Sequence, residues 1–301
     1  LTATMANATD ADSMRVVKLD AVEVVSTPKE IGTMRQQPAL SSIINAKQLD
    51  DNHIISLKGV SAMVPNFFMP DYGSRLTGVM YIRGIGSRIN TPAVGMYVDN
   101  VPYVDKSAFD FNFYDIERID ILRGPQGTLY GRNAMGGIIK VHTRNPFRYA
   151  GTDINMSFAT AENHGRMSAN HYGKLNDKFA VSIGGYGELG RGVLKNDFTG
   201  KHVDGIKAAG ARFRGIILPS DALKVDYTAS YDYSDEGAYP YFYTGTLTDK
   251  EEYQDCIGKI TNNRESRYRR SLFNTGLNLE YQTDAIVLNS ITGFQNLTDR
   301  M

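Results

Sequence analysis

The segment Ala222–Tyr233, "ALKVDYTASYDY", decides the fold class of this chain. Every second residue from Leu223 to Tyr233 is apolar or aromatic, and the residues between them are Lys, Asp, Thr, Ser and Asp. A period of two residues is typical of a β-strand with one apolar and one polar face. The pattern holds for about eleven residues, which is long for a strand of an ordinary soluble sheet.

The same alternation, less regular, recurs throughout the second half of the chain. We predict further strands over 152–160, 166–174, 178–188, 208–218, 273–281 and 285–297. Tight turns at 175–177, 219–221 and 282–284 separate longer connections that grow along the chain, the longest at 234–267. A transmembrane barrel has short turns on one side and long loops on the other. A soluble β-sheet, the alternative, gives no reason for this sorting, so we predict membrane-barrel strands.

Composition excludes several classes of function. The 33 Lys and Arg residues balance 33 Asp and Glu residues, so no net charge attracts nucleic acid. No run of 18 apolar residues exists, which excludes a transmembrane helix. The single cysteine, Cys256, excludes an intramolecular disulfide and a zinc site of four thiolates. The five histidines are scattered, and we predict no metal site and no cofactor.

Residues 50–146 have a different character, with short apolar segments between glycines. These segments are 78–86, 93–102, 116–125 and 136–146, and we expect a helix over 41–52 with Ser41 or Ser42 as its cap. Together they predict a small α+β globule of about 100 residues before the barrel strands.

The glycine-rich stretch 121–146, "ILRGPQGTLYGRNAMGGIIKVHTRNP", raises the possibility of a phosphate-binding loop. It lacks the Gly-Lys-Ser/Thr ending of a nucleotide P-loop, and Gly84-x-Gly86 lacks the third glycine of a dinucleotide fingerprint. No His-Glu-x-x-His or Gly-x-Ser-x-Gly motif is present. We therefore expect no enzymatic activity, and we interpret the glycines as tight corners of a small domain.

Three segments carry a specific resemblance to a known family. "VMYIRGIG", "AVGMYVDNVP" and "FYDIERIDILRGPQGTLYGRNAMGGIIKVHTRNP" resemble, in order and spacing, the plug domain of TonB-dependent outer-membrane receptors. Residues 19–26, "LDAVEVVS", resemble that family's energy-coupling box. The resemblance implies a mostly β protein, in which an α+β plug precedes about 7 of the expected 22 or so antiparallel strands of a transmembrane barrel.

The resemblance also implies a domain organisation. Residues 1–18 would be the mature N-terminus or a signal-peptide remnant, with Ala6-Asn7-Ala8 matching a cleavage site. A disordered Ala/Thr-rich terminus is the alternative. Residues 19–39 would hold the coupling box and a linker, 40–147 the plug, and 148–301 the first barrel strands. Seven strands cannot close such a barrel, so we expect further strands or a gene fragment.

The function implied by the resemblance is active import across the outer membrane of a Gram-negative bacterium. A ferric siderophore is the first expected ligand, cobalamin the second, and a glycan or another metal complex the third. The implied partners are the TonB energy-transducing protein, a small-molecule ligand and outer-membrane lipid, with no nucleic acid. A passive or structural barrel and a non-functional fragment are the alternatives.

Three groups of site residues follow from the resemblance. The first is the energy-coupling box, comprising Asp20, Ala21, Val22, Glu23, Val24 and Val25. The second holds the plug against the barrel through Arg83, Arg123 and Arg132. Six Lys or Arg residues against two acids within 117–148 favour a basic plug facing an acidic wall, and a solvated basic face is the alternative.

The third group would bind ligand from the outward loops 65–74, 87–91 and 102–109. Aromatic and cationic side chains suit an anionic, catechol-like chelate. Packing of these aromatics against the barrel is the alternative. The candidates are Phe67, Phe68, Met69, Tyr72, Arg88, Tyr103 and Lys106.

Overall fold

The computed structural model describes residues 40–301 except 90, 161–162, 239, 246–255 and 284–285. All described residues belong to one compact unit, Pro38–Met301. The predicted signal remnant and the energy-coupling box at Asp20–Val25 lie outside the described residues. Below, residues 40–147 are called the plug and the strands that follow are called the wall.

The plug contains a five-stranded sheet in the order β1-β6-β7-β4-β5, in which only β4 and β7 run parallel. Its strands are β1 (Leu40–Asn45), β4 (Val94–Val98), β5 (Val101–Tyr103), β6 (Ile116–Arg123) and β7 (Gly137–Thr143). A two-stranded ladder of β2 (Phe67–Phe68) and β3 (Tyr81–Ile82) lies beside it. The helical elements are α1 (Ala46–Asp51), α2 (Leu57–Val60), η2 (Arg75–Thr77), η3 (Lys106–Ala108) and α3 (Gly127–Tyr130).

The helix expected over 41–52 is wrong in its first residues. Ser41 and Ser42 lie in β1, paired with Leu122 and Ile121 of β6, and the helix begins at Ala46. Its cap is Asn45, whose side chain accepts from the Gln48 amide at 2.9 Å, while the Gln48 side chain accepts from the Asn45 amide at 3.0 Å. This reciprocal capping box outcompetes the serines.

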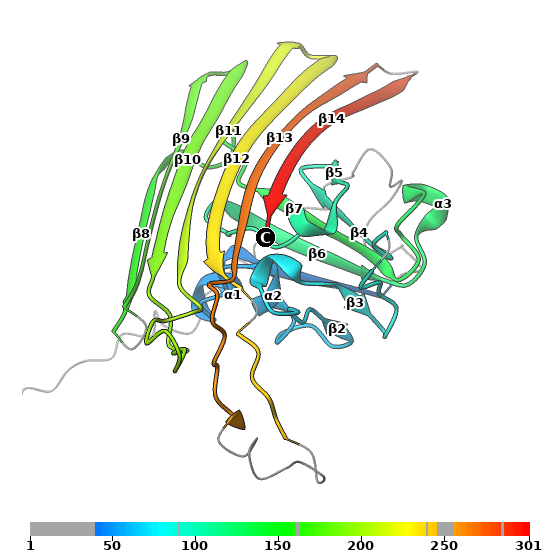
Figure 1. Cartoon of the computed structure of the whole chain (residues 1–301). Helices are drawn as coiled ribbons and strands as arrows, with labels where there is room; N and C mark the ends of the chain where they lie inside the picture. The colour runs from blue at the N-terminus through cyan, green and yellow to red at the C-terminus, as the bar shows by residue number, and fades with distance from the viewer. Residues whose placement is uncertain (1–39, 90, 161–162, 239, 246–255, 284–285) are drawn as a thin grey trace, which may run out of the picture. The chain divides into compact units, whose positions relative to one another are not determined.

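The wall is one antiparallel sheet of seven strands in chain order, and all seven predicted strands are confirmed (Figure 1). They are β8 (Gly151–Ala159), β9 (His164–Asn176), β10 (Phe179–Gly190), β11 (Ile206–Ser220), β12 (Leu223–Gly237), β13 (Arg267–Gln282) and β14 (Val287–Arg300). Tight turns follow β9, β11 and β13, and longer connections follow β10 and β12. The sorted loop lengths predicted from the sequence are therefore present.

The two faces of the wall are inverted relative to a soluble sheet. On β12, Tyr227, Tyr231 and Tyr233 are exposed, whereas Asp226 and Asp232, which directly precede Tyr227 and Tyr233, are buried. The polar face is buried because the plug lies against it. The apolar face points away from the plug and remains uncovered. Among the described residues, no helix is long and apolar enough to cross a membrane.

Candidate functional site

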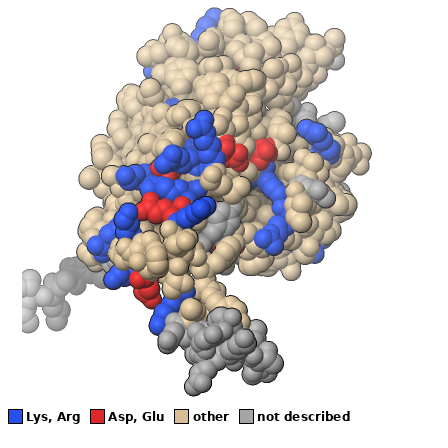
Figure 2. Space-filling view, in the orientation of Figure 1, with Lys and Arg blue, Asp and Glu red and all other residues tan. Residues whose placement is uncertain are grey.

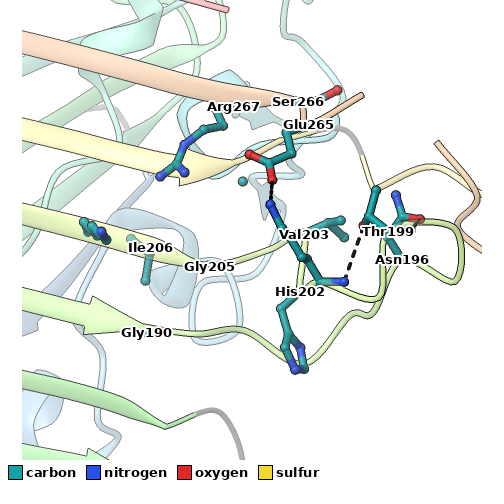
Figure 3. A pocket seen from close by; sticks show the side chains of 13 residues that line it. Gly190, Asn196, Thr199, His202, Val203, Gly205, Ile206, Glu265, Ser266 and Arg267 are labelled. Carbon is teal, nitrogen blue, oxygen red and sulfur yellow. Dashed lines mark hydrogen bonds and ion pairs between the residues drawn. The ribbon is translucent and has the colours of Figure 1, made fainter. Parts of the chain in front are cut away.

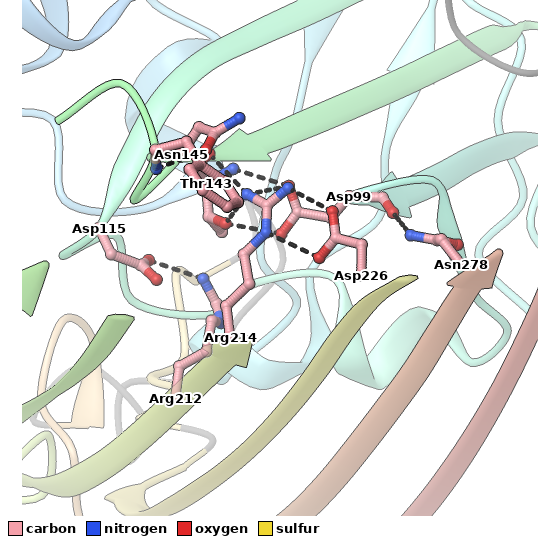
Figure 4. Close-up of polar contacts among 9 residues, drawn as sticks. Asp99, Asp115, Thr143, Asn145, Arg212, Arg214, Asp226 and Asn278 are labelled. Atoms are coloured by element: carbon pink, nitrogen blue, oxygen red, sulfur yellow. Dashed lines mark hydrogen bonds and ion pairs between the residues drawn. The ribbon is translucent and has the colours of Figure 1, made fainter. Parts of the chain in front are cut away.

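One polar cluster between plug and wall includes Asp99, at the corner between β4 and β5 (Figure 4). Asp99 and Asn100 take φ values of 47° and 69°, which these short polar residues tolerate. The Asp99 carboxylate accepts from the amide of Thr143 at 2.9 Å and from its hydroxyl at 2.7 Å. The Asp99 carbonyl accepts from Asn278 of β13 at 2.8 Å. The corner is thus tied to β7 and to the wall.

Arg214 of β11 completes this cluster. Its guanidinium binds both carboxylate oxygens of Asp226 on β12, at 3.0 and 2.8 Å, and lies 3.4 Å from Asp99. It also donates to the Thr143 carbonyl at 3.0 Å. Burial alone would raise the pKa of Asp99, but Arg214 and the two bonds from Thr143 outweigh burial, so this pKa lies below its ordinary value. Asp99 therefore stays ionised.

A second buried ion pair lies one step along the same face of β11. Arg212 donates to Asp115 of the plug at 2.6 Å, and both side chains are nearly inaccessible. The guanidinium carbon lies 5.5 and 5.4 Å from the ring centroids of Phe111 and Tyr114. Burial raises the pKa of Asp115 despite the opposing effect of Arg212. The pair is therefore held in an environment where either charge alone would be costly.

Wall side chains also satisfy the backbone of an irregular buried plug segment, residues 107–115. Asn170 and Arg166 of β9 donate to the carbonyls of Tyr114 and Phe113. Arg270 of β13 donates to the carbonyls of Ser107 and Asp110. A buried segment outside a sheet needs such partners. The wall therefore supplies hydrogen-bond donors to this part of the plug.

The charges at this interface are of both signs on both sides. Arginines of the wall reach carboxylates and carbonyls of the plug, whereas Arg144 of the plug pairs with Asp153 of β8 at 2.5 Å. Arg123 donates to Pro65 inside the plug at 3.1 Å, and Arg83 and Arg132 are exposed. The role of Arg83, Arg123 and Arg132 in barrel contacts stays a prediction.

The predicted outward loops lie at the long-loop end of the wall. Tyr241, in the loop after β12, donates to the Tyr72 carbonyl at 3.1 Å. Ser74 and the amide of Leu76 bind Glu236 near the end of β12. The plug segment 72–76 therefore contacts the end of β12 and the long loop that follows it.

The structure separates the seven ligand candidates into two sets. Phe67, Met69 and Tyr103 are at most 7% exposed and belong to the plug core, so we leave them out of the proposed ligand surface. Phe68 is 61% exposed. Tyr72 lies under the guanidinium of Arg88 at 4.2 Å, and Lys106 donates to the Arg88 carbonyl.

The accessible candidates adjoin a pocket on the plug. It measures about 470 Å³, and its lining includes Phe68, Tyr72, Tyr81 and Arg83. The Tyr72 and Tyr81 hydroxyls are 3.2 Å apart. Aromatic faces beside guanidinium groups can hold a planar anionic ligand through stacking and cation–π contacts.

A second pocket, of about 240 Å³, lies between the loop after β10 and the start of β13 (Figure 3). Lys201 binds Glu265 across it at 2.7 Å, and Asn196 donates to the Asn262 carbonyl at 2.8 Å. These contacts tie the two long loops together.

Figure 2 shows Lys and Arg mixed with Asp and Glu across the middle of the molecule, while its upper part is mostly uncharged. Among the described residues, no group of His, Cys, Asp and Glu has the arrangement of a metal site.

The wall arginines are site residues that the sequence reasoning missed. Arg212 and Arg214 occupy the polar face of the predicted strand 208–218, opposite Ala211 and Phe213. Two arginines on the face opposite the apolar side chains were a usable signal, because charges on a face that becomes buried need partners. Asp99 gave no comparable signal, since its partners are distant in sequence.

The comparisons with known proteins agree with this architecture. The family model described as the TonB-dependent Receptor Plug Domain matches residues 33–138. The pesticin receptor of Yersinia enterocolitica is 30% identical over 127 residues, which cover 42% of this chain and 19% of that receptor. The catecholate siderophore receptor of Escherichia coli K12 is 26% identical over 206 residues, covering 64% and 26%.

Solved structures show the same fold. The ferric yersiniabactin uptake receptor of Yersinia pestis aligns with a TM-score of 0.74 at 23% identity, covering 87% of this chain and 41% of that one. The closed form of the E. coli ferric-catecholate import receptor gives 0.70 at 15% identity, covering 90% and 38%. The chain thus spans less than half of these relatives. Residues 33–138 thus match the plug domain of TonB-dependent receptors, and the described part of the chain has the fold of the solved receptors.

Proposed function

We propose that this chain is part of an outer-membrane receptor that imports a scarce ligand, with a ferric siderophore as the first substrate class. The observation that carries the proposal is the plug bound through buried polar contacts to the inner face of strands whose outer face is apolar. An apolar outer face suits lipid, and a plug on the inner face would block a pore. Similar proteins that are named as siderophore receptors support the substrate class.

The exposed plug surface around Arg88 and Tyr72 favours an anionic aromatic iron chelate, rather than cobalamin, as the ligand. Arg88 stacked on Tyr72, with Lys106 and Phe68 nearby, offers cations and aromatic faces at the end where the long loops lie. Import against a gradient needs energy from outside the receptor. We propose that Asp20–Val25 supplies the link by adding as a strand to a sheet of the TonB protein.

The test is uptake by iron-starved cells that lack other siderophore receptors and carry this receptor gene. Radiolabelled ferric catecholate, ferric hydroxamate, ferric citrate and cobalamin are supplied separately, with and without a protonophore. We expect accumulation of one iron chelate that stops when the proton gradient collapses. Accumulation that is insensitive to the protonophore would support a passive barrel instead. Uptake of cobalamin alone would contradict a ferric siderophore as the substrate and assign cobalamin in its place.

A further inference from the structure

We propose that the corner Asp99–Val101 is the seat that fixes the plug on the wall, and that Gly276 and Gly293 form its socket. The inference rests on the proposed function in one respect, because it treats the wall as the side of a plugged pore. The corner is held in two ways: Val101 packs closely against the two glycines, and Asp99 makes the polar contacts described above.

The socket is a pair of glycines directly opposite each other on β13 and β14. A Cβ atom on Gly276 would lie 2.2 Å from Cγ2 of Val101, and one on Gly293 would lie 2.7 Å from Cγ1 of the same side chain. Both separations are shorter than any real contact. The two methyl groups of one valine thus occupy the space that side chains at two neighbouring positions of the wall would fill.

The backbone does not require glycine at either position. Gly276 and Gly293 lie inside regular strands and are not among the glycines with positive φ. Their role is therefore the close approach of another chain segment, which is one of the recognised uses of glycine inside a strand.

The seat has polar contacts on both sides of Val101. Asp99 reaches Arg214 of β11 through its carboxylate and Asn278 of β13 through its carbonyl. After the corner, the amides of Val104 and Asp105 both donate to the Gln295 side chain of β14 at 3.2 Å. Directional bonds and one close-packed side chain together fix the height and register of the corner against the wall. Val101, Gly276 and Gly293 are positioning residues in this account.

The first experiment measures leakage through the receptor in cells without TonB, so neither ligand nor energy coupling contributes. Gly293→Ala should displace the corner and raise the entry of a large polar antibiotic several-fold. Val101→Ala removes both γ-carbons, so adding it to Gly293→Ala should return leakage close to that of Val101→Ala alone. Gly187→Ala on β10 is the matched control, because a Cβ there meets nothing within 4 Å. Unchanged leakage in Gly293→Ala, or the absence of rescue by Val101→Ala, would overturn the proposal.

The second experiment keeps the proposal testable if Gly293→Ala fails to fold. A Cβ on Gly276 would lie 3.3 Å from the Val101 Cβ, close to the roughly 3.5–4.5 Å of disulfides. In a Cys256→Ser background, Val101→Cys with Gly276→Cys should oxidise almost completely in the membrane, as measured by thiol labelling. Val101→Cys with Gly187→Cys should stay reduced. Equal yields in the two pairs would contradict the seat, whatever the receptor transports.

Discussion

Arg212 of the wall donates to Asp115 of the plug at 2.6 Å, and the Phe111 and Tyr114 rings lie within 6 Å of its guanidinium carbon. This is a salt bridge between two parts of the fold that are 97 residues apart in sequence. Neither charge has easy access to water, so the pair contributes to plug seating only while both members are present.

Removing one member of this pair should destabilise the protein strongly. Arg212→Met leaves the Asp115 carboxylate buried without its partner, which costs about 3–5 kcal/mol in comparable cases. We expect a clear fall in the melting temperature of the detergent-solubilised protein. The double variant Arg212→Met/Asp115→Asn should recover much of the loss, because no charge is then left unpaired.

An exposed ion pair provides the control for this prediction. Lys201 and Glu265 also pair at 2.7 Å, but both side chains are more than half exposed. Lys201→Met should leave the melting temperature nearly unchanged, because water screens an exposed pair. Similar melting temperatures for Arg212→Met and Lys201→Met would contradict the burial argument.

Asp99 should make stability depend on pH in a specific direction. Its pKa is lowered from the ordinary 3.8, so its ionised form favours the folded state. That contribution is present above pH 3.8 and is lost as pH falls through the lower folded-state pKa. The melting-temperature difference between the wild type and Asp99→Asn should therefore be widest near neutral pH and shrink below 3.8.

Asp115 should show the opposite slope. Burial raises its pKa above the ordinary 3.8, so its contribution is lost as pH rises through the folded-state value. The difference between wild type and Asp115→Asn should fall with rising pH. Parallel pH profiles for Asp99→Asn and Asp115→Asn would show that the two carboxyls lie in similar environments, contrary to the structure.

Arg88 should matter for ligand affinity through its position over Tyr72. Arg88→Ala removes a cation and a stacking group, and we expect the Kd for an anionic aromatic iron chelate to rise about tenfold. Arg88→Lys should recover only part of the affinity, because lysine lacks the planar guanidinium. Fluorescence quenching with the purified receptor measures both.

Lys178→Ala is the control for ligand binding, because Lys178 lies in the turn before β10, at the opposite end of the strands. It should leave the Kd unchanged. A Kd that responds equally to Arg88→Ala and Lys178→Ala would indicate a general charge effect and remove Arg88 from the ligand surface.

The wall could be predicted from sequence because its signal is local. Alternation such as that around Tyr227 and Asp226 lies within a short stretch of sequence. It predicts that a strand forms, which side chains share a face, and where the next turn lies. The start of α1 was misplaced because Ser41 and Ser42, the expected caps, pair with β6 as part of β1, and the capping box of Asn45 starts the helix after that strand. That pairing joins residues about 80 positions apart and leaves no local trace.

The plug–wall contacts were predicted only in part, for a similar reason. Of the basic residues within 117–148, Arg144 reaches Asp153 of the wall, whereas Arg123 bonds inside the plug. The decisive groups were Arg212 and Arg214 on the wall and two aspartates at plug corners. Burial also divides the ligand candidates: neighbours such as Phe67 and Phe68 differ in exposure from 4% to 61%, because strand residues alternate between faces.

The central claim, energy-coupled import, is tested most directly by a proline in the coupling box. Val24→Pro removes a backbone donor that strand addition to TonB would need, whereas Val24→Ala keeps it. Cells carrying each variant are compared for binding and for accumulation of the radiolabelled iron chelate. We predict that Val24→Pro binds ligand normally but accumulates none, and that Val24→Ala accumulates it at a rate near that of the wild type. Undiminished accumulation by Val24→Pro would contradict the account.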